Sequence, residues 1–176
     1  MSKFSPSRTA LQAAFALSSL AAASQALAYD WGDGLSLAKK EGDQYALLVS
    51  PLTQHFHPSP EHKHVWLVGV ERKREDHSLA GAAFFSNSFG QHSAYLFPWG
   101  QTYHDLLGKE HLYVKWTAGL LYGYREPYEN KVPFNYHGFS PAIVPAVGWQ
   151  FDNRYTVQLN LLGLNGAMLQ FSLPVR

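Results

Sequence analysis

The chain has 176 residues, with 14 Lys and Arg, 13 Asp and Glu, nine His and no Cys. The absence of cysteine excludes disulfides and thiol chemistry. The even charge balance argues against a nucleic-acid partner, because no basic run is available to neutralise phosphates. Aromatic residues make up 15% of the chain, which suits a membrane barrel whose two interfaces carry aromatic girdles.

The first 28 residues have the three parts of a secretory signal peptide. Lys3 and Arg8 form a basic start, 10–23 is a run of apolar and small residues, and Ala26-Leu27-Ala28 is an A-x-A cleavage site. The segment lacks the caps and the periodicity of an ordinary helix. We therefore expect export, cleavage after Ala28 and one mature domain, residues 29–176. Residues 30–44 precede the first strand as a short amphipathic helix at the membrane surface or as a solvated arm, and both readings stay open.

After this leader, eight segments have the alternating pattern or the length of strands. The expected strands are 45–56, 63–72, 78–86, 92–99, 111–125, 140–151, 154–162 and 166–173. An even number of antiparallel strands is what a closed single-chain outer-membrane barrel requires. No stretch after residue 28 approaches the ~18 consecutive apolar residues of a transmembrane helix.

The clearest strand is HLYVKWTAGLLYGYR, residues 111–125. Its even positions are apolar and its odd positions are mostly polar or small, which gives a period of two over fifteen residues. Strands of soluble proteins have about 5–6 residues, whereas a tilted strand needs about 9–11 to cross a bilayer. Alternation alone does not say which face points inward, so a soluble lipocalin-like barrel is the alternative. The length of 111–125 and its Trp116, Tyr122 and Tyr124, expected to point outward, favour a transmembrane barrel.

Topology then predicts a pair of polar residues at one rim. If both termini face the periplasm, the first strand ends at His55 on the outside and residues 87–91 form the second external loop. His55 and Ser88 should therefore lie at neighbouring positions. An imidazole can take a proton from a hydroxyl near neutral pH, so the pair is capable of acyl transfer.

Two short motifs at this rim, LTQHF (52–56) and FFSNSFG (84–90), resemble the PagP family of outer-membrane lipid A palmitoyltransferases. WTAG (116–119) and PAIVPAVGW (141–149) are similar to that family's fifth and sixth strands. The resemblance implies an eight-stranded barrel with an N-terminal amphipathic helix. It also implies transfer of palmitate from an outer-leaflet glycerophospholipid to lipid A, without a cofactor or a metal. The chain is expected to act as a monomer in the cell outer membrane.

The resemblance also implies the site residues. His55 matches the family's catalytic histidine and Ser88 its serine, while Asn87 stands where the family has an aspartate. We expect His55 to be the base, Ser88 a nucleophile or hydrogen-bonding partner, and Asn87 a polar organiser whose NH₂ could also donate to an oxyanion. In the family, prolines flank lateral openings in the wall, and Pro51, Pro141 and Pro145 are candidates for such gates.

The histidines of TQHFHPSPEHKH, residues 53–64, allow a different reading. The spacing H-x-H…H-x-H could support a metal ion in a hairpin, and that alternative stays open. We expect His55 to be the working histidine and His57, His62 and His64 to be dispensable.

Two other functions compete with acyl transfer. A lipid A deacylase would need a His and a Ser two positions apart on one strand face, whereas His92 and Ser93 are adjacent and point opposite ways. A non-enzymatic barrel would have an interior packed with polar and charged side chains. The inward series of 115, 117, 119, 121 and 123 is partly small and apolar instead, as an acyl-chain pocket would need.

Overall fold

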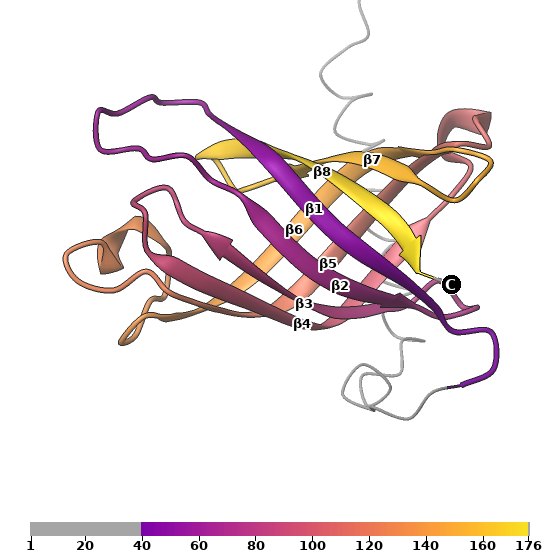
Figure 1. Cartoon of the computed structure of the whole chain (residues 1–176), viewed down its shortest axis with the longest axis horizontal. Helices are drawn as coiled ribbons and strands as arrows, with labels where there is room; N and C mark the ends of the chain where they lie inside the picture. Colours follow the sequence, from indigo (N-terminus) through magenta and orange to yellow (C-terminus); the bar gives the residue numbers. More distant parts are fainter. Residues whose placement is uncertain (1–39, 176) are drawn as a thin grey trace, which may run out of the picture. The chain divides into compact units, whose positions relative to one another are not determined.

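A computed structural model describes residues 40–175, which form a closed, all-β, antiparallel barrel (Figure 1). Each strand pairs with the next along the chain, and the first also pairs with the last. The strands are β1 (Gln44–His55), β2 (Leu67–Lys73), β3 (Leu79–Ser86), β4 (His92–Tyr103), β5 (Leu112–Tyr122), β6 (Phe139–Gln150), β7 (Thr156–Leu161) and β8 (Gly166–Val175). The predicted eight-stranded barrel is confirmed. The expected signal peptide and most of the arm at 30–44 lie outside the described residues.

The two ends of the barrel differ in their connections. One end, called the site rim, carries the loops 56–66, 87–91, 123–138 and 162–165, and the other end, called the terminal rim, is where β1 begins and β8 ends (Figure 1). Short 3-10 helices lie in two links, η1 (Leu106–Gly108) and η2 (Glu129–Lys131). No helix within residues 40–175 is long and apolar enough to cross a membrane.

The largest differences from the predicted strand ends are at β2, β4 and β5. β2 begins at Leu67 rather than 63. β4 continues to Tyr103, beyond the expected 92–99, so the link to β5 at the terminal rim is shorter than predicted. β5 ends at Tyr122 rather than 125, because Gly123 adopts a φ of 134° that interrupts the extended backbone. A Cβ at Gly123 would overlap Ser93 on the neighbouring strand, so this bend needs glycine.

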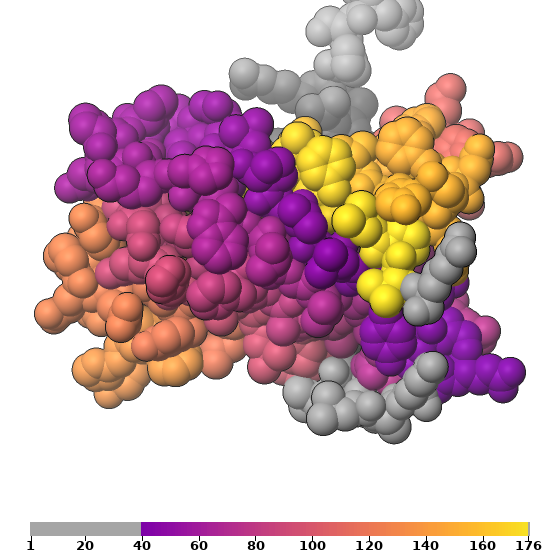
Figure 2. Space-filling model, viewed as in Figure 1, coloured from indigo at the N-terminus to yellow at the C-terminus, as the bar shows by residue number. Residues whose placement is uncertain are grey.

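The strand alternation places apolar side chains on the outer face, and the inner face carries polar side chains in the middle of the barrel and apolar ones toward the site rim. In β5, Lys115 and Thr117 are buried in the interior, and the even positions face outward as predicted. Figure 2 shows part of the outer wall, where β1 (indigo) and β8 (yellow) lie side by side. A lipocalin-like barrel would show polar side chains on its outer face, so the apolar outer face favours the transmembrane alternative. Exposed apolar side chains of the wall include Leu47, Val68, Val70, Phe84, Leu96, Leu120, Ile143, Leu159, Leu161 and Phe171.

The interior is apolar toward the site rim. Its buried cluster comprises Leu48, Val65, Leu67, Ala83, Phe85, Phe97 and Met168. These residues come from β8, from β1 to β4 and from the segment just before β2, which are consecutive neighbours around the wall. They surround the upper part of a cavity that is described with the site below.

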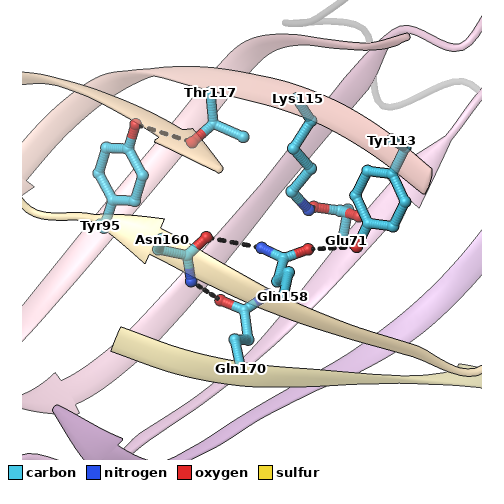
Figure 3. Close-up of polar contacts among 8 residues, drawn as sticks. All are labelled: Glu71, Tyr95, Tyr113, Lys115, Thr117, Gln158, Asn160 and Gln170. Atoms are coloured by element: carbon cyan, nitrogen blue, oxygen red, sulfur yellow. Dashed lines mark hydrogen bonds and ion pairs between the residues drawn. The ribbon is translucent and has the colours of Figure 1, made fainter. Parts of the chain in front are cut away.

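A network of polar side chains crosses the middle of the barrel (Figure 3). Lys115 Nζ donates to Glu71 Oε2 at 2.7 Å, and both side chains are buried. Gln158 Nε2 donates to Asn160 Oδ1 at 2.6 Å, and Gln158 Oε1 accepts a hydrogen bond from the Tyr113 hydroxyl at 2.9 Å. Since each of these buried side chains has a hydrogen-bonding partner, the free-energy cost of removing them from water is offset by hydrogen bonds. The members of the network are Glu71, Tyr113, Lys115, Gln158, Asn160 and Gln170.

The wall has two seams where pairing stops before the site rim. The β1–β2 register ends at Ser50 opposite Leu67, and the β6–β7 register ends at Ala146 opposite Asn160. Within the described residues, 51–55 therefore have no register partner on β2, and 139–145 have none on β7. Pro51, Pro141 and Pro145 lie in these segments, and a proline offers no N–H to a neighbouring strand.

Candidate active site

The barrel topology brings His55 and Ser88 into contact at the site rim. β1 runs toward this rim and ends at His55, and β3 runs the same way and ends just before the loop that carries Ser88. His55 Nε2 lies 2.6 Å from Ser88 Oγ, although the two residues are 33 positions apart in sequence. The predicted proximity is confirmed. An imidazole at this distance can accept the hydroxyl proton when the serine attacks an electrophile.

Asn87 is nearly fully buried, at 1% exposure, and its side chain is used to hold the loop. Its Oδ1 accepts the backbone N–H groups of Phe89 at 2.9 Å and Gln91 at 3.0 Å, as in an Asx-turn. Its Nδ2 donates to Gln91 Oε1 at 3.3 Å and to the Gly123 carbonyl at 3.4 Å. Both amide hydrogens are thus committed to the protein, which favours the organising role over donation to an oxyanion.

Tyr124 contacts the site, although its place in the alternation predicted an outward side chain. The bend at Gly123 ends the regular strand, and the Tyr124 side chain faces the cavity and bonds to Ser88 through its hydroxyl. Burial raises the pKa of the Tyr124 phenol, and the hydrogen bond with Ser88 opposes this shift. The phenol therefore stays protonated at neutral pH and can donate. The glycine between two tyrosines in YGY is the sequence signal that could have found this residue.

The other histidines of residues 53–64 differ in position. His62 stacks on His55, with ring centroids 3.9 Å apart and an interplanar angle of 30°. His57 and His64 are exposed. Within residues 40–175, no group of three or more His, Cys, Asp or Glu side chains is arranged to hold a metal ion. His62 therefore contacts His55, whereas His57 and His64 are exposed, and the sequence spacing alone did not predict this difference.

A cavity of about 530 Å³ opens beneath the His55–Ser88 pair. The pair, His62 and Tyr124 line its mouth, and its walls carry the apolar cluster of the barrel interior. Its far end is lined by Glu71, Lys115 and Gln158, which also line a second cavity of about 470 Å³ at the terminal rim. The volume of the upper cavity falls within the range of ligand sites in proteins, about 300–1,000 Å³.

His92 and Ser93 do not form a second His–Ser pair. His92 is exposed on the outer face of β4, where its ring lies 5.7 Å from that of Phe84, and Ser93 is buried in the interior at 1% exposure. The adjacent residues point to opposite faces, as the strand period predicts. The geometry expected of a deacylase pair is therefore not met by these two residues.

No protein-family model and no curated protein matches the chain in comparisons with known proteins. The resemblance to the PagP family accordingly rests on the short motifs at the site rim and in the fifth and sixth strands.

Proposed function

We propose that this protein is an outer-membrane acyltransferase of the PagP type, which moves a palmitoyl chain from a glycerophospholipid to lipid A. The observation that carries the proposal is the His55–Ser88 contact of 2.6 Å at the mouth of an apolar cavity. Such a pair can exchange an acyl group between two hydroxyls, and such a cavity can hold the chain while it does so.

The outer surface supports a position in the membrane. Apolar side chains face outward on every side of the wall, and several strands reach 10–12 residues, enough for a tilted strand to cross a bilayer. The closed barrel pairs each strand with a neighbour on both sides, so outside the two seams the wall's backbone groups need no partner chain. Both features fit a monomer in the outer membrane.

The chemistry assigned to the site uses His55 and Ser88 in turn. His55 Nε2 takes the Ser88 Oγ proton as Oγ forms a bond to the donor's ester carbon, and the carbonyl oxygen becomes an oxyanion. In this proposal the Tyr124 hydroxyl, which lines the same cavity mouth as Ser88, donates to that oxyanion. The bond between the acyl carbon and the glycerol oxygen then breaks, and His55 returns the proton to that oxygen, which leaves as a hydroxyl.

The second half of the reaction repeats these steps with the acceptor. A lipid A hydroxyl gives its proton to His55 and attacks the acyl-serine carbon, after which the Ser88 oxygen leaves and recovers a proton from His55. One ester is exchanged for another and no electrons are transferred, so the reaction needs no external energy source or redox partner.

The size and apolar lining of the cavity fit the binding of an alkyl chain, whereas a barrel with a purely structural role would have its interior filled by side chains. Its upper wall is formed by apolar side chains such as Leu67, Phe85 and Met168. Moving a chain from water into such a site gains about 0.8 kcal/mol per CH₂, although the gain from bilayer to cavity is smaller because the chain leaves another apolar phase. A non-enzymatic barrel with a fully polar interior fits this half of the molecule poorly.

Mass spectrometry of lipid A from cells with and without the protein tests the proposal. The wild type should add a palmitoyl mass, whereas His55→Ala and Ser88→Ala should insert normally into the membrane and add none. His64→Ala is the matched control, since this exposed histidine belongs to the same loop. Unaltered lipid A in wild-type cells, or full activity of His55→Ala, would contradict the proposal.

A further inference from the structure

His62 covers one face of the base proposed for acyl transfer. Its ring stacks on that of His55 at 3.9 Å between centroids, and its other contact is edge-on with Phe89 at 5.7 Å. The Nδ1 atom of His62 is buried and makes no hydrogen bond within the described residues. The ring is therefore used for its flat surface rather than as a hydrogen-bonding partner.

A catalytic histidine normally needs a third group to fix its ring, and this group is often a carboxylate. In the described part of the chain, no carboxylate lies against the His55 ring. Asn87, which stands where the resemblance would place an aspartate, directs its side chain into its own loop. The orientation of His55 must come from another contact.

We infer that His62 is a positioning residue for the transfer reaction and holds the His55 imidazole so that Nε2 faces Ser88 Oγ. This inference rests on the proposed function. It changes the expectation for the histidine cluster, because one of the three histidines expected to be dispensable supports the working one.

His62 is itself held in a fixed relation to Ser88. The backbone N–H of Lys63, the next residue, donates to the Ser88 carbonyl at 2.8 Å and joins the two loops. Phe89, the residue after Ser88, contacts the His62 ring and is stacked on Tyr128 with centroids 4.2 Å apart. A movement of the first loop would thus shift His62 and the serine together, which preserves the geometry of the pair.

Substitutions at position 62 test the contribution of the flat ring separately from that of its nitrogen atoms. His62→Phe keeps a flat ring and removes the buried Nδ1, whereas His62→Ala removes the stack. His64→Ala serves as the control in the same loop. The full mature proteins would be refolded in detergent and assayed with a phosphatidylcholine donor and purified lipid A. The His55 Hε1 resonance would be followed by ¹H–¹³C NMR in the same samples.

We expect His62→Ala to lower kcat by about 10²-fold, as for a misplacement of the order of 1 Å, with little change in the donor KM. His62→Phe should recover most of the wild-type kcat. The His55 Hε1 signal should show a ring-current shift in the wild type and in His62→Phe, and that shift should be lost in His62→Ala.

The two readouts separate the failure of this inference from that of the proposed function. Equal kcat in His62→Ala and the wild type, or a kcat for His62→Phe as low as that for His62→Ala, would overturn the positioning role. If the wild type transfers no acyl chain, the proposed function fails, and the NMR result decides the role of His62 alone. If the wild type is inactive and the His55 Hε1 chemical shift is the same in His62→Ala and the wild type, the positioning role of His62 is overturned as well.

Discussion

The hydrogen bonds of Asn87 explain why an amide fits where the resemblance would place a carboxylate. Its Oδ1 accepts two backbone N–H groups, which a carboxylate could also do. Its Nδ2, however, faces two oxygen acceptors, Gln91 Oε1 and the Gly123 carbonyl. A carboxylate oxygen in that place would lie against two other oxygens without a hydrogen. The loop around Ser88 is therefore built for asparagine.

Replacing Asn87 should destabilise the loop that carries Ser88, and the acyl transfer should be weakened as a consequence. In Asn87→Ala, the N–H groups of Phe89 and Gln91 lose their buried acceptor, and a loss of this kind typically costs about 1–3 kcal/mol per group. We expect a lower midpoint of thermal unfolding in detergent and a partial loss of transfer. Ser88→Ala should leave the midpoint unchanged and serves as the comparison. An Asn87→Ala protein with wild-type stability and activity would contradict the organising role.

The residues of the site differ in how far the sequence could predict them. His55 and Ser88 followed from strand order, because two strands that run the same way end at the same rim. Tyr124 did not follow, since its direction depends on the φ of Gly123. The stacking of His62 depends on how two loops pack together, which no periodicity encodes.

A histidine at the terminal rim gives a prediction about pH and stability. His104 Nε2 accepts a hydrogen bond from Lys73 Nζ at 2.8 Å, and its ring lies 5.1 Å from that of His77. Burial, followed by the charges of Lys73 and His77, lowers the pKa of His104 to about 4, against a weaker opposing effect of Asp105. The folded protein therefore holds this imidazole neutral where an unfolded chain would begin to protonate it.

The sign of the effect follows from proton binding. Between pH 6.5 and about 4, the unfolded chain binds more protons at His104 than the folded chain, so stability falls as the pH falls through this window. We expect His104→Asn to have a flatter profile of unfolding free energy between pH 7 and 4, measured by urea denaturation in detergent. His77 is present in both proteins, so its contribution to the pH dependence of the unfolding free energy is the same in both. Parallel profiles for the two proteins would show that His104 does not contribute.

At the scale of the strands, the period of two together with segment length was sufficient to find all eight. The alternation is clear in β5, where the interior is polar, and weaker in β3, where inward residues such as Phe85 are apolar as well. The ends were harder to place. β4 continues through Pro98 to Tyr103, and β5 stops at Gly123, whose positive φ interrupts the extended backbone.

The two seams in the wall predict where lipid enters. Because pairing is missing beyond Ser50 on β1 and beyond Ala146 on β6, these are the places where the wall can part without breaking strand hydrogen bonds. Disulfides at the last paired outward positions, Val49 with Val68 and Val147 with Leu159, should hold the seams closed. We expect each bridge to slow acyl transfer until it is reduced.

The control for the seams lies on the fully paired part of the wall. A disulfide between positions 82 and 96, register partners on β3 and β4, should leave activity unchanged. Since the native chain has no cysteine, each introduced pair has a single partner, and bridge formation can be followed by gel mobility. Unchanged transfer with both seam bridges formed would rule out lateral entry at these seams.

At the scale of the whole molecule, the alternation in the sequence predicted a barrel without saying which face points inward. The length of 111–125 and its aromatic residues favoured an apolar outer face, and the structure has that polarity. The buried Lys115–Glu71 pair and the exposed Ile143, at 72% exposure, show an interior and a surface that suit a lipid environment.

The expected export of the chain follows from the first 28 residues, which lie outside the described residues. We predict that the mature protein begins at or near Tyr29 and fractionates with the outer membrane. Amino-terminal sequencing of protein purified from separated membranes measures both. Recovery from the soluble periplasmic fraction would contradict the membrane barrel.

The polar network across the barrel also has a consequence for whether solutes can pass through the protein. Glu71, Lys115 and Gln158 stand between the two cavities, and their side chains are held by hydrogen bonds to one another or to neighbours on facing strands. If the protein lies in the outer membrane as proposed, we expect these side chains to block the passage of nutrients, ions and antibiotics through the barrel. In a planar lipid bilayer the barrel should carry no steady current, so a cell can make many copies of it without becoming leaky.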